Sequence, residues 1–154
     1  MTVFETQLSG KRGTILGNGW GREIICATAI VAMTTAMLDN VNDDVGLFYV
    51  PAGAVIVGAM VSATDMDTNG SPTLAFDIGD SADEDRIFAA SAVGQAATLS
   101  QAIARTAHLY KYTAETQIRA YIQAVSATPA AGTLTFSLFY FVDPEFNTTA
   151  LVAA

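Results

Sequence analysis

Short hydrophobic segments separated by strong turn signals fill the middle of this 154-residue chain. Between Asp43 and Ser91 the turns fall at Pro51-Ala52-Gly53, around Asn69-Gly70 and in the acidic stretch 79–85. In the third segment, Leu74, Phe76 and Ile78 alternate with more polar residues, and a period of two is typical of half-buried strands. The pattern predicts a meander of four adjacent antiparallel strands, with Asn69-Gly70 supplying the positive φ angles of a tight hairpin. It argues against a nucleotide-binding α/β sheet. The expected strands cover residues 45–50, 54–63, 73–78 and 86–91.

Further strands are predicted on both sides of this meander. Residues 23–38 are rich in β-branched side chains, which favours one long strand or two. Residues 117–125 resemble a buried strand, and in 133–142 the residues Thr133, Thr135 and Ser137 alternate with apolar ones. Residues 89–108 fit either a short helix or a loop. About eight strands with short turns indicate an all-β fold, an antiparallel β-sandwich with a jelly-roll-like topology as the leading candidate.

Three regions are expected along the chain. Residues 1–22 contain five glycines and little periodicity, which predicts an extended N-terminal arm. Residues 23–144 hold the predicted strands and form the β-sandwich domain. Residues 145–154 form a C-terminal tail that could be free or could exchange with a neighbouring subunit.

The shortage of charged residues points to assembly. Charged residues make up 14% of the chain and hydrophobic ones 51%, whereas about 25% of the residues in a soluble domain are usually charged. Scattered exposed Ala and Thr could cover part of the surface. The alternative, which we favour, is that other subunits cover it, and this predicts a homo-oligomer.

The net charge of −8 is unevenly distributed, because no Lys or Arg occurs from Ile24 through Asp85. Nucleic-acid binding is disfavoured, since it needs a dense basic patch. The acidic region is either a solvated face or a surface on which a neighbour's basic arm docks. Trp20 is either an anchor in a pocket of another subunit or an ordinary core residue. The candidate residues for a contact with another subunit or with a capsid are therefore Lys11, Arg12, Trp20 and Arg22.

No arrangement of residues predicts catalysis, a cofactor or a metal site. Cys26 is the single cysteine, lies in an apolar run and is expected to be a buried thiol without an activating base. The acids of residues 77–85 do not have the spacing of an EF-hand calcium loop. Residues 45–64 lack charge over 20 positions, but Pro51 and Gly53 interrupt them centrally, so two strands are favoured over a membrane span.

Three stretches of the sequence resemble small virion proteins of tailed bacteriophages. The first runs from Tyr49 to Ala59 and includes Pro51-Ala52-Gly53-Ala54. The second is Leu74 to Asp80, with Asp77-Ile78-Gly79-Asp80, and the third is Asp85 to Ala89. They are similar to segments of capsid decoration (cement) proteins, head-fibre bases and related accessory proteins. The similarity covers about 45 residues and consists of turn and strand positions, so no functional residue is transferred.

The resemblance implies a jelly-roll-like sandwich, commonly a homotrimer, that binds the major capsid protein lattice on the outer capsid surface of the virion. Its expected function is to stabilise the head, without nucleic-acid or membrane partners. The alternative is a head-fibre or tail accessory protein whose loops bind a host surface glycan. A hydrolase using acids of residues 77–85 is the least favoured interpretation.

Overall fold

The computed structural model describes residues 23–143, and these form an all-β domain, as predicted. Two short 3₁₀ turns, η1 (Thr35–Leu38) and η2 (Val93–Gln95), interrupt the strands. The predicted arm, residues 1–22, and the predicted tail, residues 145–154, lie outside the described residues. The strands are β1 (Ile25–Met33), β2 (Asp44–Val50), β3 (Ala54–Ala63), β4 (Ala75–Asp80), β5 (Asp83–Ser91), β6 (Leu99–Ser100), β7 (Thr116–Ala124) and β8 (Gly132–Val142).

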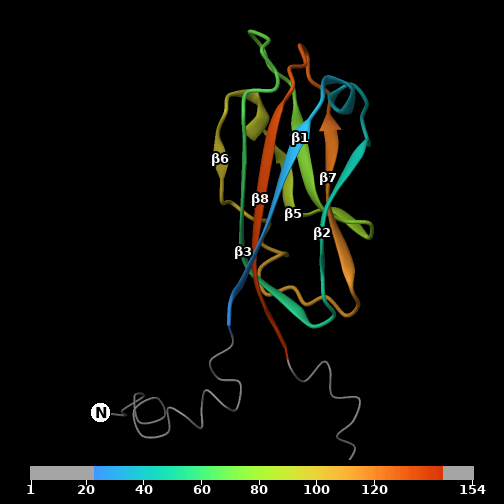
Figure 1. The fold of residues 1–154 in the computed structure, drawn as a ribbon, viewed down its shortest axis with the longest axis vertical. Coiled ribbons are helices and arrows are strands. Elements are labelled where there is room, and N and C mark those ends of the chain that lie inside the picture. Colours follow the sequence, from blue (N-terminus) through green and yellow to red (C-terminus); the bar gives the residue numbers. More distant parts are fainter. Residues whose placement is uncertain (1–22, 144–154) are drawn as a thin grey trace, which may run out of the picture.

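The strands form two four-stranded sheets with the orders β1-β8-β3-β6 and β2-β7-β4-β5. All neighbouring strands are antiparallel. Strand β1 pairs with β8, β2 with β7, β3 with β6 and β4 with β5. The four pairs are nested, so the chain resembles one long hairpin whose strand pairs alternate between two sheets. This is the topology of a jelly roll. Figure 1 shows the two layers, with β1, β8 and β3 side by side in one of them.

The hydrophobic core lies between the two sheets. On β8 the residues Leu134, Phe136, Leu138 and Tyr140 are buried, which confirms the predicted alternation. Phe136 stacks on Phe48 of the opposite sheet at a centroid distance of 5.7 Å. Burying each such side chain stabilises the fold by about 1.5–3 kcal/mol, so these residues contribute substantially to the packing of the two sheets. Further large side chains that are at most 2% exposed are Met33, Leu38, Ile56, Met66, Leu74, Phe76, Ile78, Ile87, Phe88, Ile118 and Ile122.

The predicted meander is wrong, because only β4 and β5 form a hairpin between neighbours in the sequence. Strand β2 pairs with β7, whereas β3 pairs with β8 and β6 in the other sheet. The turn at Pro51-Ala52-Gly53, where Gly53 has a φ of 86°, carries the chain across the sandwich from one layer to the other. A tight turn between two strands has the same local signature whether the strands pair or separate into two sheets.

Three other local predictions are corrected. Gly70 is not among the described residues with positive φ, and residues 64–74 instead form a connection between sheets. Residues 23–38 contain a strand that ends at Met33, followed by η1, whose Leu38 is fully buried at the end of the core. For residues 89–108 the sequence suggested either a short helix or a loop. The structure instead has the end of β5, η2 and the short strand β6 in this segment.

The uncharged stretch 45–64 forms β2, a turn and β3. In the part of the chain that the structure describes, no helix has the length and apolarity needed to cross a membrane.

Candidate functional site

The two ends of the described chain leave the sandwich at the same end. Strand β1 begins there and β8 finishes there, as Figure 1 shows. The Asp143 N–H donates to the carbonyl of Gly53 (2.9 Å), which ties the end of β8 to the turn before β3. The four candidate interface residues, Lys11, Arg12, Trp20 and Arg22, lie outside the described residues, and so their contact remains a prediction.

The two sheets differ sharply in charge. Strands β1, β3, β6 and β8, all within the described residues, contain no Asp, Glu, Lys, Arg or His. The other sheet carries eight charged residues, which are Asp44, Asp77, Asp80, Asp83, Glu84, Asp85, Arg86 and Arg119. An outward strand face normally carries polar and charged side chains, so the first sheet is unusual for a surface exposed to water.

The strand register shows which residues lie on the outer side of this sheet. Partners across an antiparallel ladder point to the same side. Since Leu134, Phe136 and Leu138 point inward, their neighbours in the strand point outward. We call the outer side the uncharged face. Its residues are Cys26, Thr28 and Ile30 of β1, Thr135, Ser137 and Phe139 of β8, Gly58, Met60 and Ser62 of β3, and Leu99 of β6.

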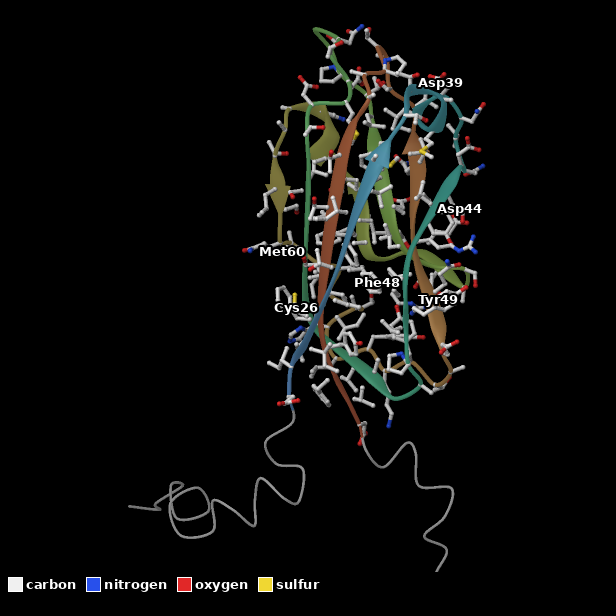
Figure 2. The ribbon with its side chains drawn as sticks, viewed as in Figure 1. Cys26, Asp39, Asp44, Phe48, Tyr49 and Met60 are labelled. Atoms are coloured by element: carbon white, nitrogen blue, oxygen red, sulfur yellow. The ribbon has the colours of Figure 1, made fainter. Side chains whose placement is uncertain are left out.

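Side chains of the uncharged face contact one another across neighbouring strands. Thr28 and Ser137 share a hydrogen bond between their hydroxyl groups (2.8 Å). The Phe139 ring lies over Gly58, where a Cβ atom would be 3.8 Å from the ring. The Ile30 side chain is 72% exposed at one edge of the face and that of Leu99 is 56% exposed at the other. Figure 2 labels Cys26 and Met60, which belong to its first and third strands in sheet order.

Cys26 is exposed, so the prediction of a buried thiol is wrong. Its partner across the ladder is Phe139 rather than a core residue, which places it on the outer side of an edge strand. The apolar run around Cys26 indicated burial because its neighbours are hydrophobic. In this sheet, however, even the outer side is uncharged.

The acidic turn between β4 and β5 is only partly solvated. Asp80 is 2% exposed, and its carboxylate accepts hydrogen bonds from the N–H groups of Ala82 (2.9 Å) and Asp83 (3.1 Å). The Arg86 Nε donates to Asp80 Oδ2 at 2.5 Å, and its guanidinium lies 3.9 Å from the centre of the Tyr110 ring. Arg86 therefore offsets part of the repulsion between the acids of this turn through a buried ion pair with Asp80.

The charges of this turn affect their neighbours in different directions. A hydrogen bond that the protonated Asp83 carboxyl donates to the Asp85 carboxylate, together with burial, raises the pKa of Asp83. Burial alone would lower the pKa of Arg86, but the hydrogen bond and charge of Asp80 outweigh it and raise this pKa. Burial, followed by the nearby Asp80 carboxylate, raises the pKa of Tyr112. The turn is a compact electrostatic cluster on the charged sheet.

Asp67 is a second buried carboxylate, which the sequence patterns missed. It is 1% exposed and accepts four backbone hydrogen bonds. Two come from Thr73 (2.7 Å) and Leu74 (3.0 Å) before β4. The other two come from Ala127 (3.0 Å) and Thr128 (2.9 Å) between β7 and β8. Asp67 therefore joins two loops at one end of the sandwich.

The environment of Asp67 predicts that the free energy of unfolding decreases in acid. Burial alone would raise its pKa, but the four N–H donors outweigh this and hold the pKa well below the usual value of Asp. A lowered pKa in the folded state stabilises the protein above the unfolded pKa of about 3.9, and this contribution is lost as the pH falls through the folded pKa. We expect the difference in free energy of unfolding between the parent and Asp67→Asn to narrow from about pH 5 downwards. Urea titrations of both proteins across this range measure it, and a constant difference would contradict the assignment.

Among residues 23–143, no group of three or more His, Cys, Asp and Glu side chains is placed to hold a metal ion. A surface hollow of about 350 Å³ lies between the end of β5 and strand β6 and is lined mostly by small and apolar residues. The clearest functional feature is therefore the contrast between the two sheet faces.

Comparisons with solved structures identify related chains in bacteriophage capsids. A chain in the capsid asymmetric unit of cyanophage Pam1 is 31% identical, with a TM-score of 0.72, and the match covers 81% of this chain and 89% of that one. A chain in the capsid of Ralstonia phage GP4 is 27% identical, with a TM-score of 0.68, over 79% of this chain and 85% of that one.

A third match shows the fold alone. It is a chain in the acid-stable capsid of Helicobacter pylori bacteriophage KHP30, 13% identical with a TM-score of 0.50, over 79% of this chain and 93% of that one. No protein-family model and no curated protein sequence matches the chain. The Pam1 match extends over most of both chains, so the predicted resemblance to phage virion proteins is confirmed, and this protein belongs to a family of bacteriophage capsid structural proteins.

Proposed function

We propose that this protein is a capsid decoration (cement) protein that binds the outer surface of the assembled major capsid lattice and stabilises the phage head. The observation that carries the proposal is the 31% identity to a Pam1 capsid chain over 89% of that chain's length. The relative is thus also a small protein built almost entirely from this one sandwich. A single compact domain of this kind suits an added layer on a shell.

The proposed mechanism is thermodynamic. A subunit that bridges neighbouring shell proteins binds the assembled lattice and not the separated ones, so its binding free energy adds to the stability of the shell. A homotrimer would engage three lattice positions at once and gain avidity beyond one weak contact. The rigid sandwich suits this function because it needs no moving part.

The lattice contact is proposed to involve the N-terminal arm, through Lys11, Arg12, Trp20 and Arg22. These residues precede β1, and both ends of the described chain leave the sandwich at one end. Three basic residues within a chain of net charge −8 give the arm the opposite sign to the acidic surface of the sandwich. An arm attached at one end can reach a neighbour without displacing the sheet faces.

Co-sedimentation with capsids that lack this protein tests the proposal. The full chain is expected to pellet with assembled capsids and to raise their heat resistance, but not to bind unassembled major capsid protein. Binding to host-surface glycans with no pelleting on capsids would instead support the head-fibre or tail function.

Removal of residues 2–22 is expected to reduce pelleting to background while leaving the thermal unfolding of the sandwich unchanged. Removal of residues 145–154 is the matched control, since that segment carries no basic residue. If the arm deletion pelleted as well as the full chain, the proposed arm contact would be wrong although the decoration function could still hold through another surface.

A further inference from the structure

The uncharged face has no counterpart on the opposite sheet. Its four strands carry no ionisable side chain other than Cys26 and Tyr140, and Tyr140 points into the core. Ile30 and Leu99 stand exposed at its two edges. A sheet face of this kind is poorly suited to water and is typical of a surface that another protein covers.

The distribution of charge favours a second copy of this chain as the covering partner. The chain has a net charge of −8, and all eight charged residues of the two sheets lie on β2, β4, β5 and β7. Contact between two copies through those strands would bring acids such as Asp44 and Asp77 together, which is unfavourable. Contact through the uncharged face keeps the acids of both copies in water. This face is therefore the broad surface through which like-charged copies can approach one another.

We propose that the uncharged face is covered by another copy of this chain in the assembled protein. The inference rests on self-association of the proposed decoration protein and adds a surface for it. Because both copies would use the same face, this contact joins copies in pairs and is separate from the contacts that would form a homotrimer. Shape supports it as well, because the side chains on the face are small apart from Phe139, Met60 and the two edge residues. Thr28 and Ser137 share a hydrogen bond, so one of their two hydroxyl hydrogens already has an acceptor when the face is covered.

The size of the face sets the expected strength of the contact. Strand β1, with nine residues, is about 30 Å long, and four strands are about 15 Å across. The area of this face is smaller than that of a standard interface, which buries about 800 Å² on each partner. Association through it is therefore expected to depend on concentration, and we would measure it over a dilution series by light scattering coupled to size exclusion.

Two variants test the contact from opposite edges of the face. Ile30→Asp and Leu99→Asp each place a charge on a side chain that is already exposed, so neither removes core packing. Each is expected to weaken self-association at least tenfold and shift the measured mass toward the monomer. Tyr49→Asp is the matched control, because Tyr49 is 61% exposed on β2, the edge strand of the charged sheet. It is expected to associate like the parent.

Cys26 provides an independent measurement, since it is the single cysteine and lies on the uncharged face. Its rate of maleimide labelling in the parent is expected to fall as the protein concentration rises. In Ile30→Asp the rate should stay high at all concentrations. Circular dichroism of each variant checks that the fold is retained.

Three results would overturn the inference. The parent could remain monomeric at every concentration, both variants could associate like the parent, or Cys26 could react equally fast in the monomer and the oligomer. None of these measurements includes capsids. A protein that self-associates through this face but does not pellet with capsids would overturn the decoration function and leave the contact intact.

Discussion

Asp67→Ala is expected to lower the free energy of unfolding by about 4 kcal/mol, because it leaves four backbone N–H groups without an acceptor at a buried position. The donors lie on two loops that are far apart in the sequence, before β4 and after β7. Loss of the carboxylate therefore weakens the connection between the loops as well as four single hydrogen bonds. Thermal and urea unfolding of the purified variant measure the effect.

Asp67→Asn is the graded comparison. The asparagine carbonyl can take the position of Oδ2, which accepts from Thr73, Leu74 and Ala127, but its amide group then faces the N–H of Thr128. We expect this variant to lose about half as much stability as Asp67→Ala. Asp39→Ala, at an exposed position, serves as the control and should unfold like the parent. If all three variants unfolded at the same urea concentration, Asp67 would have no such stabilising function.

Arg86→Met is expected to lower the free energy of unfolding by about 3 kcal/mol, because it leaves the Asp80 carboxylate buried without its cation. Methionine keeps much of the apolar stem but removes both the ion pair and the stacking on Tyr110. Urea unfolding of the parent and the variant provides the measurement.

Arg119→Met is the matched control for Arg86→Met. Arg119 also forms an ion pair, with Asp44, but the two side chains are 38% and 32% exposed compared with 11% and 3% for Arg86 and Asp80. Water screens the exposed pair and can solvate Asp44 after the substitution, so little change in stability is expected. Equal effects of the two substitutions would show that burial of the Asp80–Arg86 pair is not what makes it important.

The two sheets differ in their chemistry, because the strands of one sheet carry eight charged residues and those of the other carry none. Both stabilising carboxylates lie away from the uncharged face, Asp80 at the end of β4 and Asp67 in a loop. Variants at these acids should therefore change stability without changing self-association. Variants at Ile30 and Leu99 should change self-association without changing stability.

The strands themselves followed from local sequence patterns. Alternation along Leu134, Phe136 and Leu138 predicted β8, and the limits of β3 coincide with the predicted segment 54–63. Period-two alternation is a property of neighbouring residues, so it can be recognised without knowledge of the fold. The turn at Pro51–Gly53 was also recognisable, because proline and glycine restrict the backbone locally.

The tertiary structure alone decided which strands pair and what their outer faces share. The absence of charge from 24–38, 54–63 and 132–142 is visible in the sequence, but nothing local indicates that β1, β3 and β8 lie in one sheet. Asp67 likewise finds its donors 6 to 61 residues away, and exposed Cys26 sits in a run that is locally indistinguishable from a core strand. Strand pairing and burial depend on contacts between residues that are far apart in the sequence. These contacts exist only once the strands have assembled into two packed sheets.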